Sequence, residues 1–228
     1  MPHVIPDEPT GWSEIKTDYS SGSFTFPEIG YFKIVVVGGG GRGANGNFQG
    51  PDIGDGGYDG YNKATGGGGG GSGGFAESKF LKQQGETISY TVGSTVTCEG
   101  MVATSGRNGS GRSGGEAGTA SGGNLRNVQG AKGGTGEYES KKSNFSVSAS
   151  GGSGGRNEYS YGGSGGDASG RASGGSGSPG NTGSRPCIKI YRGNTNIPLD
   201  VQNARDITAN ALAITALAQE QTSLLLQK

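Results

Sequence analysis

The sequence is poor in the residues that most catalytic sites require. Its single histidine, His3, lies near the beginning of the chain, so a Ser/His/Asp or Cys/His arrangement has almost nothing to build on. Residues 38–43 read GGGGRG after an apolar run, but the lysine and the following helix of a phosphate-binding loop are missing. We therefore expect no catalytic residues and no cofactor.

The sequence also lacks a charge imbalance and long apolar runs. Lys plus Arg and Asp plus Glu both number 19, so no basic excess favours a nucleic-acid partner. No apolar run reaches about 18 residues, and residues 1–10 (MPHVIPDEPT) do not resemble a secretory signal, so we expect neither secretion nor membrane insertion. Whether Cys98 and Cys187 pair stays open, although without a secretory signal reduced thiols are favoured.

Glycine takes the place of the missing hydrophobic residues. It accounts for 52 of 228 residues, while only 29% are hydrophobic, so a conventional core is not expected. Each glycine loses much backbone entropy on folding and buries no side chain. Collagen is excluded, because the run at residues 66–71 breaks its triplet pattern and the chain has only 8 prolines. The composition leaves disorder or an unusual ordered fold.

Short hydrophobic segments frame and interrupt the glycine-rich region. Their alternating or β-branched patterns predict strands at residues 23–27, 31–37, 75–81, 87–92, 96–102, 145–147 and 187–191. Between them, glycines recur at every third position, as at Gly40, Gly43 and Gly46, which is the period of polyproline II. Such segments have glycine edges that let backbones approach and exchange N–H···O bonds. The expected fold is mostly irregular and β, with short strands, including a core contact from Phe145, framing a packed polyglycine II slab.

We expect three parts: an irregular docking or capping segment at 1–22, a glycine-rich domain at 23–193, and a linker with a C-terminal α-helix at 194–228. The last 28 residues contain neither glycine nor proline, and apolar residues recur there at spacings of four and three. This stripe predicts attachment to a partner or self-association through Ile207, Ala211, Ile214, Ala218 and Leu225.

Aromatic residues interrupt the glycine segments, often beside Asn, Asp or Arg. Tyrosine among Ser, Gly and Asn is typical of binding loops, because its rigid ring gives contact area at low entropic cost. The candidate receptor contacts are Tyr58, Tyr61, Tyr138, Tyr159 and Tyr161. The alternative is that these rings only cap the edges of the slab.

Scattered carboxylates leave two further possibilities. A glycosidase needs a pair of nearby acids, and those available are Asp52, Asp55, Asp59, Glu137 and Glu139. The spacing of the three aspartates fits neither an EF-hand nor a calcium-binding nonapeptide repeat. We interpret these acids as solvated turn residues and expect no metal site.

Four segments, taken in order, resemble a known family. They are FTFPEIGYFKIVVVGGGGRG (24–43), GGGGGGSGGFAESKFL (66–81), GETISYTVGS (85–94) and CIKIYRG (187–193). Over residues 23–193 this order resembles the glycine-rich domain of phage and prophage tail proteins, and the phasing is similar to distal tail-fibre adhesins with polyglycine II helices.

The resemblance implies a non-enzymatic tail-fibre or tail-tip adhesin that recognises a bacterial surface receptor, protein or glycan, through loops. Such a protein is assembled in the host cytoplasm, works in the virion and contacts other tail proteins. The alternatives are a non-binding structural tail component held by its C-terminal helix, and a glycan-cleaving enzyme.

Overall fold

The computed structural model describes residues 8–50, 60–142, 145–171 and 174–194, and every regular element within them is a β-strand. The chain divides into two units, residues 1–12 with 193–228, and residues 13–192. In the described part of the first unit, the Thr10 N–H donates to the Asn194 carbonyl at 3.0 Å. The predicted C-terminal helix, with its proposed assembly stripe, lies outside the described residues.

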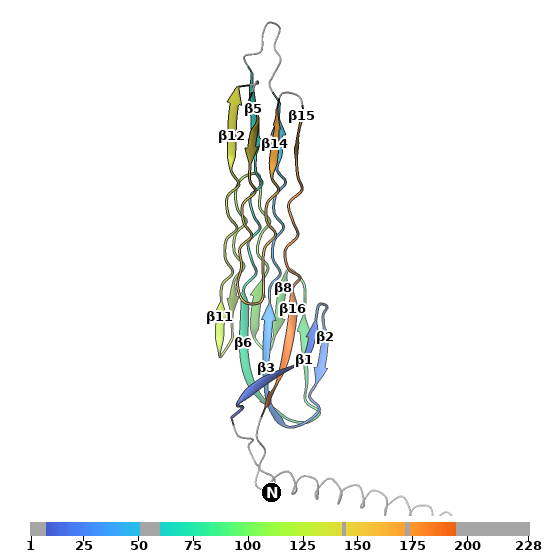
Figure 1. The fold of residues 1–228 in the computed structure, drawn as a ribbon. Helices are drawn as coiled ribbons and strands as arrows, with labels where there is room; N and C mark the ends of the chain where they lie inside the picture. Colours follow the sequence, from blue (N-terminus) through green and yellow to red (C-terminus); the bar gives the residue numbers. More distant parts are fainter. Residues whose placement is uncertain (1–7, 51–59, 143–144, 172–173, 195–228) are drawn as a thin grey trace, which may run out of the picture. The chain divides into compact units, whose positions relative to one another are not determined.

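Two antiparallel five-stranded sheets pack face to face in the larger unit (Figure 1). The first has the order β1-β16-β3-β6-β11 and the second β10-β9-β8-β7-β2. The strands of the first sheet are β1 (Gly11–Asp18), β3 (Gly30–Val37), β6 (Phe75–Lys82), β11 (Arg126–Val128) and β16 (Cys187–Asn194). Those of the second are β2 (Gly22–Thr25), β7 (Thr87–Thr91), β8 (Thr95–Cys98), β9 (Met101–Thr104) and β10 (Ala120–Ser121).

The main apolar core lies between these sheets. Phe32, Ile34 and Val36 of β3 face the second sheet, while Val35 and Val37 are buried on the opposite face. Burial on both faces explains why β3 is a continuous apolar run rather than an alternating one. The prediction that flanking strands supply an apolar cluster is confirmed.

Two sequence predictions differ from this part of the structure. Residues 11–18, expected to be irregular, form edge strand β1, which pairs with β16. The apolar segment 96–102 is two strands rather than one, because Glu99 and Gly100 form a turn with φ of 50° and 77°. Two consecutive residues with positive φ are typical of a type I′ hairpin.

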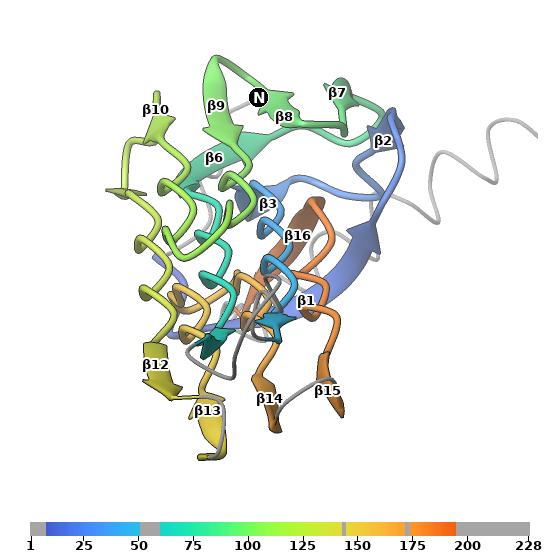
Figure 2. The same ribbon diagram turned by 90° about the horizontal axis from the view of Figure 1, so that it is seen from above.

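Glycine-rich segments extend from the sandwich side by side, each winding about its own axis (Figure 2). We call them the glycine bundle; they are 38–46, 66–74, 105–111, 113–119, 130–137, 150–156, 161–167 and 178–184. Their backbone hydrogen bonds repeat every third residue. The N–H groups of Gly38, Gly41 and Ala44 donate to segment 66–74, while those of Gly40, Gly43 and Gly46 donate to segment 178–184.

Segment 66–74 lies at the centre of the bundle, and all its residues are buried. Its N–H groups donate in rotation to segments 130–137 and 161–167 and to the 104–111 stretch, and its carbonyls accept from 38–46, 113–119 and 150–156. A Cβ placed on Gly70 would lie 2.1 Å from the Gly41 carbonyl oxygen. This enclosure explains why the longest glycine run of the sequence occurs here.

At the end of the bundle away from the sandwich lie two three-stranded sheets, β12-β5-β4 and β13-β14-β15 (Figure 1). The strands are β4 (Asn47–Gln49), β5 (Tyr61–Thr65), β12 (Tyr138–Lys142), β13 (Val147–Ala149), β14 (Ala168–Arg171) and β15 (Gly174–Gly177). Small residues, Ala64, Val147, Ala149 and Ala168, pack between them with Phe48. The prediction that Phe145 is a core contact is wrong, because its side chain is 55% exposed. Its carbonyl accepts a hydrogen bond from Asn62 Nδ2 at 2.7 Å.

Candidate functional site

The outer face of the β12-β5-β4 sheet gathers two of the predicted tyrosines. In the antiparallel register Tyr61 lies opposite Lys142, Lys63 opposite Ser140, and Thr65 opposite Tyr138. Residues directly opposite each other share a face of the sheet. Tyr61 and Tyr138 are 49% and 48% exposed, whereas Asn62 and Ala64, which alternate with the outer residues, are buried.

We call this surface the tyrosine–lysine face; it comprises Tyr61, Lys63, Tyr138, Ser140 and Lys142. It was only partly predicted. Tyr61 and Tyr138 were expected on loops, but both lie on strands, which fix their backbones through the ladder. The lysines were missed, although the alternation in YNKAT (61–65) carries a signal for an outward lysine at position 63.

Basic groups surround the tyrosines of this face. The Arg112 guanidinium lies 5.4 Å from the centre of the Tyr138 ring, a cation–π contact, and its Nε donates to the Gly136 carbonyl at 3.2 Å. Lys63 and Lys142 are exposed on the same face. The face therefore has an aromatic and cationic character suited to an anionic or polar ligand.

The two glutamates flanking Tyr138 accept hydrogen bonds from the backbone of residues 148–150 instead. Glu139 Oε2 accepts the Ser148 N–H at 2.6 Å, and its other oxygen pairs with Lys141 at 2.7 Å. The hydrogen bond from Lys141, followed by that from the Ser148 N–H, lowers the pKa of the Glu139 carboxyl. Glu137 similarly accepts the Ser150 N–H at 3.1 Å. Glu137 and Glu139 thus both accept hydrogen bonds from backbone N–H groups. The aspartates at 52, 55 and 59 lie outside the described residues.

Tyr159 lies apart from this face and points inward. Its hydroxyl donates to Glu77 Oε1 at 2.9 Å, and its ring packs edge-on against Phe75 at 4.7 Å between centroids. Glu77 is only 4% exposed. Its carboxylate also accepts hydrogen bonds from Arg126 Nε and Nη2, at 2.9 and 3.0 Å. Burial acts to raise the pKa of the Glu77 carboxyl, but the hydrogen bonds from Arg126 and Tyr159 outweigh it, and the net pKa is lowered.

The turn that carries Tyr159 closes one end of the central glycine segment. Asn157 Nδ2 donates to the Gly73 carbonyl at 2.6 Å, and the Gly73 N–H donates to Ser160 Oγ at 2.9 Å. At this end of the bundle the Gly73 N–H and carbonyl therefore bond to side chains rather than to the backbone of a neighbouring segment. The position of Tyr159 fits the alternative that some tyrosines cap the slab.

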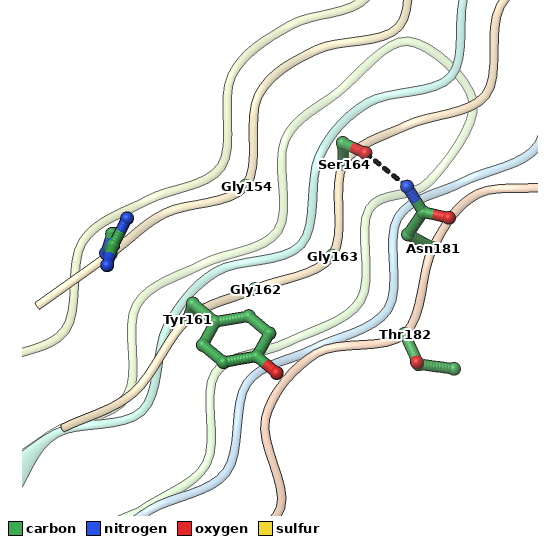
Figure 3. A pocket seen from close by; sticks show the side chains of 8 residues that line it. Gly154, Tyr161, Gly162, Gly163, Ser164, Asn181 and Thr182 are labelled. Atoms are coloured by element: carbon green, nitrogen blue, oxygen red, sulfur yellow. Dashed lines mark hydrogen bonds between the residues drawn. The ribbon is translucent and has the colours of Figure 1, made fainter.

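The remaining predicted tyrosines lie elsewhere. Tyr161 is 55% exposed on the side of the bundle, where it lines a cavity of about 450 Å³ (Figure 3). Tyr58 is outside the described residues. Among the candidate tyrosines that the structure describes, Tyr61 and Tyr138 are the two that share a face.

Both cysteines are buried and not bonded to each other. Cys98 belongs to the core between the large sheets, and Cys187 to the cluster on the opposite face of β3. Burial raises the pKa of the Cys98 thiol to about 12 and also raises that of Cys187. Both thiols are therefore protonated at neutral pH and poorly nucleophilic.

No protein-family model, curated protein or solved structure matches the chain. Within residues 8–50, 60–142, 145–171 and 174–194, His, Cys, Asp and Glu side chains form no group of three or more that could hold a metal ion. The same described ranges contain no helix with the length and apolarity needed to cross a membrane.

Proposed function

We propose that the chain is a receptor-binding adhesin of a phage tail fibre or tail tip. In this proposal the glycine bundle is a packed array of polyglycine II helices that acts as a rigid support. The tyrosine–lysine face makes the contact with a receptor on the bacterial surface. The observation that carries the proposal is the exposure of Tyr61 and Tyr138 on one strand-built face at the end of the bundle away from the sandwich.

The physical support is pre-organisation. Ladder hydrogen bonds fix the backbones of β5 and β12, so an exposed ring on either strand loses little further entropy when it binds. Lys63 and Lys142 add positive charge, which accelerates encounter with an anionic receptor group. Tyrosine and arginine are enriched among the residues that dominate binding energy at interfaces, and here Arg112 lies against the Tyr138 ring.

A structural tail component remains the second candidate, and the apolar stripe at Ile207, Ala211, Ile214, Ala218 and Leu225 favours it. In either case we propose that this stripe joins the chain to other tail proteins or to further copies of itself. Deleting residues 200–228 is expected to leave residues 13–192 folded and to abolish that association, as measured by light scattering. Unfolding of the truncated chain would show instead that the stripe belongs to the core.

The proposal is tested with fluorescently labelled protein and a panel of bacterial strains. We expect strain-selective binding that the double variant Tyr61→Ala/Tyr138→Ala weakens by at least about tenfold, since truncating an anchor residue costs more than 1 kcal/mol. Tyr19→Ala is the matched control, because Tyr19 is 51% exposed but lies between β1 and β2. A folded wild-type chain that binds no strain, or a double variant that binds like Tyr19→Ala, would refute the proposal.

A further inference from the structure

A second surface of the bundle has the features of a ligand site and is not part of the tyrosine–lysine face. It is the cavity of about 450 Å³ beside Tyr161, between segments 150–156, 161–167 and 178–184. Its lining combines backbone glycines with one aromatic ring, one guanidinium and several small polar groups. We call it the lateral groove.

The floor of the lateral groove is bare backbone. A Cβ on Gly154 or Gly163 would lie 1.9 Å from a carbonyl oxygen, that of Gly162 or Asn181 respectively, so close packing of the segments excludes side chains there. The floor is also occupied in hydrogen bonding: the Gly162 N–H donates to Gly155 at 2.7 Å and the Gly163 N–H to Gly41 at 2.9 Å. These two donors are therefore not available to a ligand.

Two groups on the walls, the Tyr161 backbone and the Asn181 amide, are held by hydrogen bonds. Tyr161 is held by its backbone, whose N–H donates to Ser184 Oγ at 3.0 Å and whose carbonyl accepts the Ser184 N–H at 2.8 Å, while its ring is 55% exposed. Asn181 Nδ2 donates to Ser164 Oγ at 2.7 Å, which orients the amide (Figure 3). Thr182 lies beside it on the same segment, and Arg156 adds a guanidinium to the lining.

We propose that the lateral groove binds a saccharide. A pyranose ring presents a face of C–H groups and an edge of hydroxyls, so it needs an exposed aromatic ring beside short polar side chains. Tyr161 supplies the ring, and Asn181, Thr182 and Arg156 supply donors and acceptors for the hydroxyls. A single guanidinium among neutral groups suits an uncharged sugar better than a polyanion.

The test is an NMR titration of the ¹⁵N-labelled full chain with the neutral disaccharides cellobiose, maltose, lactose and chitobiose. At least one is expected to shift the amide signals of Gly162, Gly163, Asn181 and Thr182 saturably, with Kd in the millimolar range. Tyr161→Ala is expected to raise that Kd about tenfold, because the ring is the anchor of the site. Because the Tyr161 side chain is 55% exposed, the variant is expected to fold like the wild type, and the thermal midpoint checks this.

Tyr61→Ala separates this inference from the proposed function, because it alters the tyrosine–lysine face and leaves the lateral groove intact. The inference requires the disaccharide Kd to be the same in Tyr61→Ala and wild type, whatever the result of the cell-binding assay. It is overturned if none of the four disaccharides shifts the groove amides, or if Tyr161→Ala titrates like the wild type.

Discussion

At the scale of single residues, the glycines of segment 66–74 are required for packing rather than for turns. Their carbonyl neighbours are backbone atoms held by further hydrogen bonds, so they cannot move aside for a methyl group. The same reasoning does not extend to Gly93, where an added Cβ would meet only the Thr95 carbonyl oxygen at 3.8 Å. Gly70, within segment 66–74, and Gly93 therefore form a matched pair of positions for testing this packing.

We expect Gly70→Ala to lower the free energy of unfolding by at least about 3 kcal/mol, at the upper end of the cost of overpacking. Gly93→Ala is expected to be neutral or to stabilise by up to about 1 kcal/mol, because alanine restricts the unfolded chain. Urea denaturation followed by circular dichroism measures both. Equal stability of the two variants would mean that segment 66–74 is not enclosed.

The Glu77 carboxylate predicts an acid dependence of stability. Its pKa in the folded chain is lowered, below the unfolded value of about 4.3. The ionised group therefore contributes stability above about pH 4.3, and this contribution is lost as the pH falls through the folded pKa. We expect Glu77→Gln to cost about 1–3 kcal/mol at pH 7 and to reduce the loss of stability between pH 5 and 3, relative to wild type.

Denaturation midpoints measured across that pH range check the expectation. Glu116→Gln is the control, since Glu116 is an exposed partner of Lys132. A Glu77→Gln variant whose stability falls with acid as steeply as that of the wild type would contradict the role assigned to this carboxylate.

At the scale of elements, the sequence predicted the strands that have their own hydrophobic pattern. Residues 31–37 and 187–191 appear as β3 and β16, because apolar side chains there are buried between layers. Most strands at the far end of the bundle were missed, although the strand predicted at 145–147 overlaps β13 at Val147. YESKK (β12) and ASGR (β14) contain little to bury, and pairing with adjacent strands rather than local pattern makes them extended.

The candidate site was partly predictable for the same reason. Tyrosine among glycine identified Tyr61 and Tyr138, but only the strand register places them on one face with Lys63 and Lys142. Tyr159 has the same local composition, yet it is tied to a buried carboxylate that lies 82 positions away in the sequence. Such a distant contact leaves no local signal.

The charge of the tyrosine–lysine face gives a prediction for kinetics. If it meets an anionic receptor, Lys63→Glu/Lys142→Glu is expected to slow association by about tenfold or more at low salt, with a smaller effect at high salt. Lys132→Glu is the control, because Lys132 is 61% exposed but lies on segment 130–137. Association rates with the strain identified as a binder, measured by stopped flow or on a surface, test this prediction. Identical rates for the double variant and for Lys132→Glu would exclude electrostatic steering by this face.

At the scale of the whole unit 13–192, backbone hydrogen bonds join segments that a hydrophobic core would join in other proteins. Apolar clusters lie in the sandwich and between the small far-end sheets, and the glycine bundle connects them. The period of three in the sequence predicted that glycine segments could pack edge to edge. It could not predict which segments are neighbours, because glycine edges are interchangeable until flanking strands and turns fix their order.

The central claim is that the glycine segments form an enclosed, hydrogen-bonded bundle, and amide hydrogen exchange tests it most directly. In the ¹⁵N-labelled chain, the amides of residues 66–72 are expected to be among the slowest to exchange, approaching the rates of β3, because each donates to a neighbouring segment away from water. Exchange of those amides at the rates of an unstructured peptide, while β3 stays protected, would contradict the bundle and with it the rigid support on which the proposed function depends.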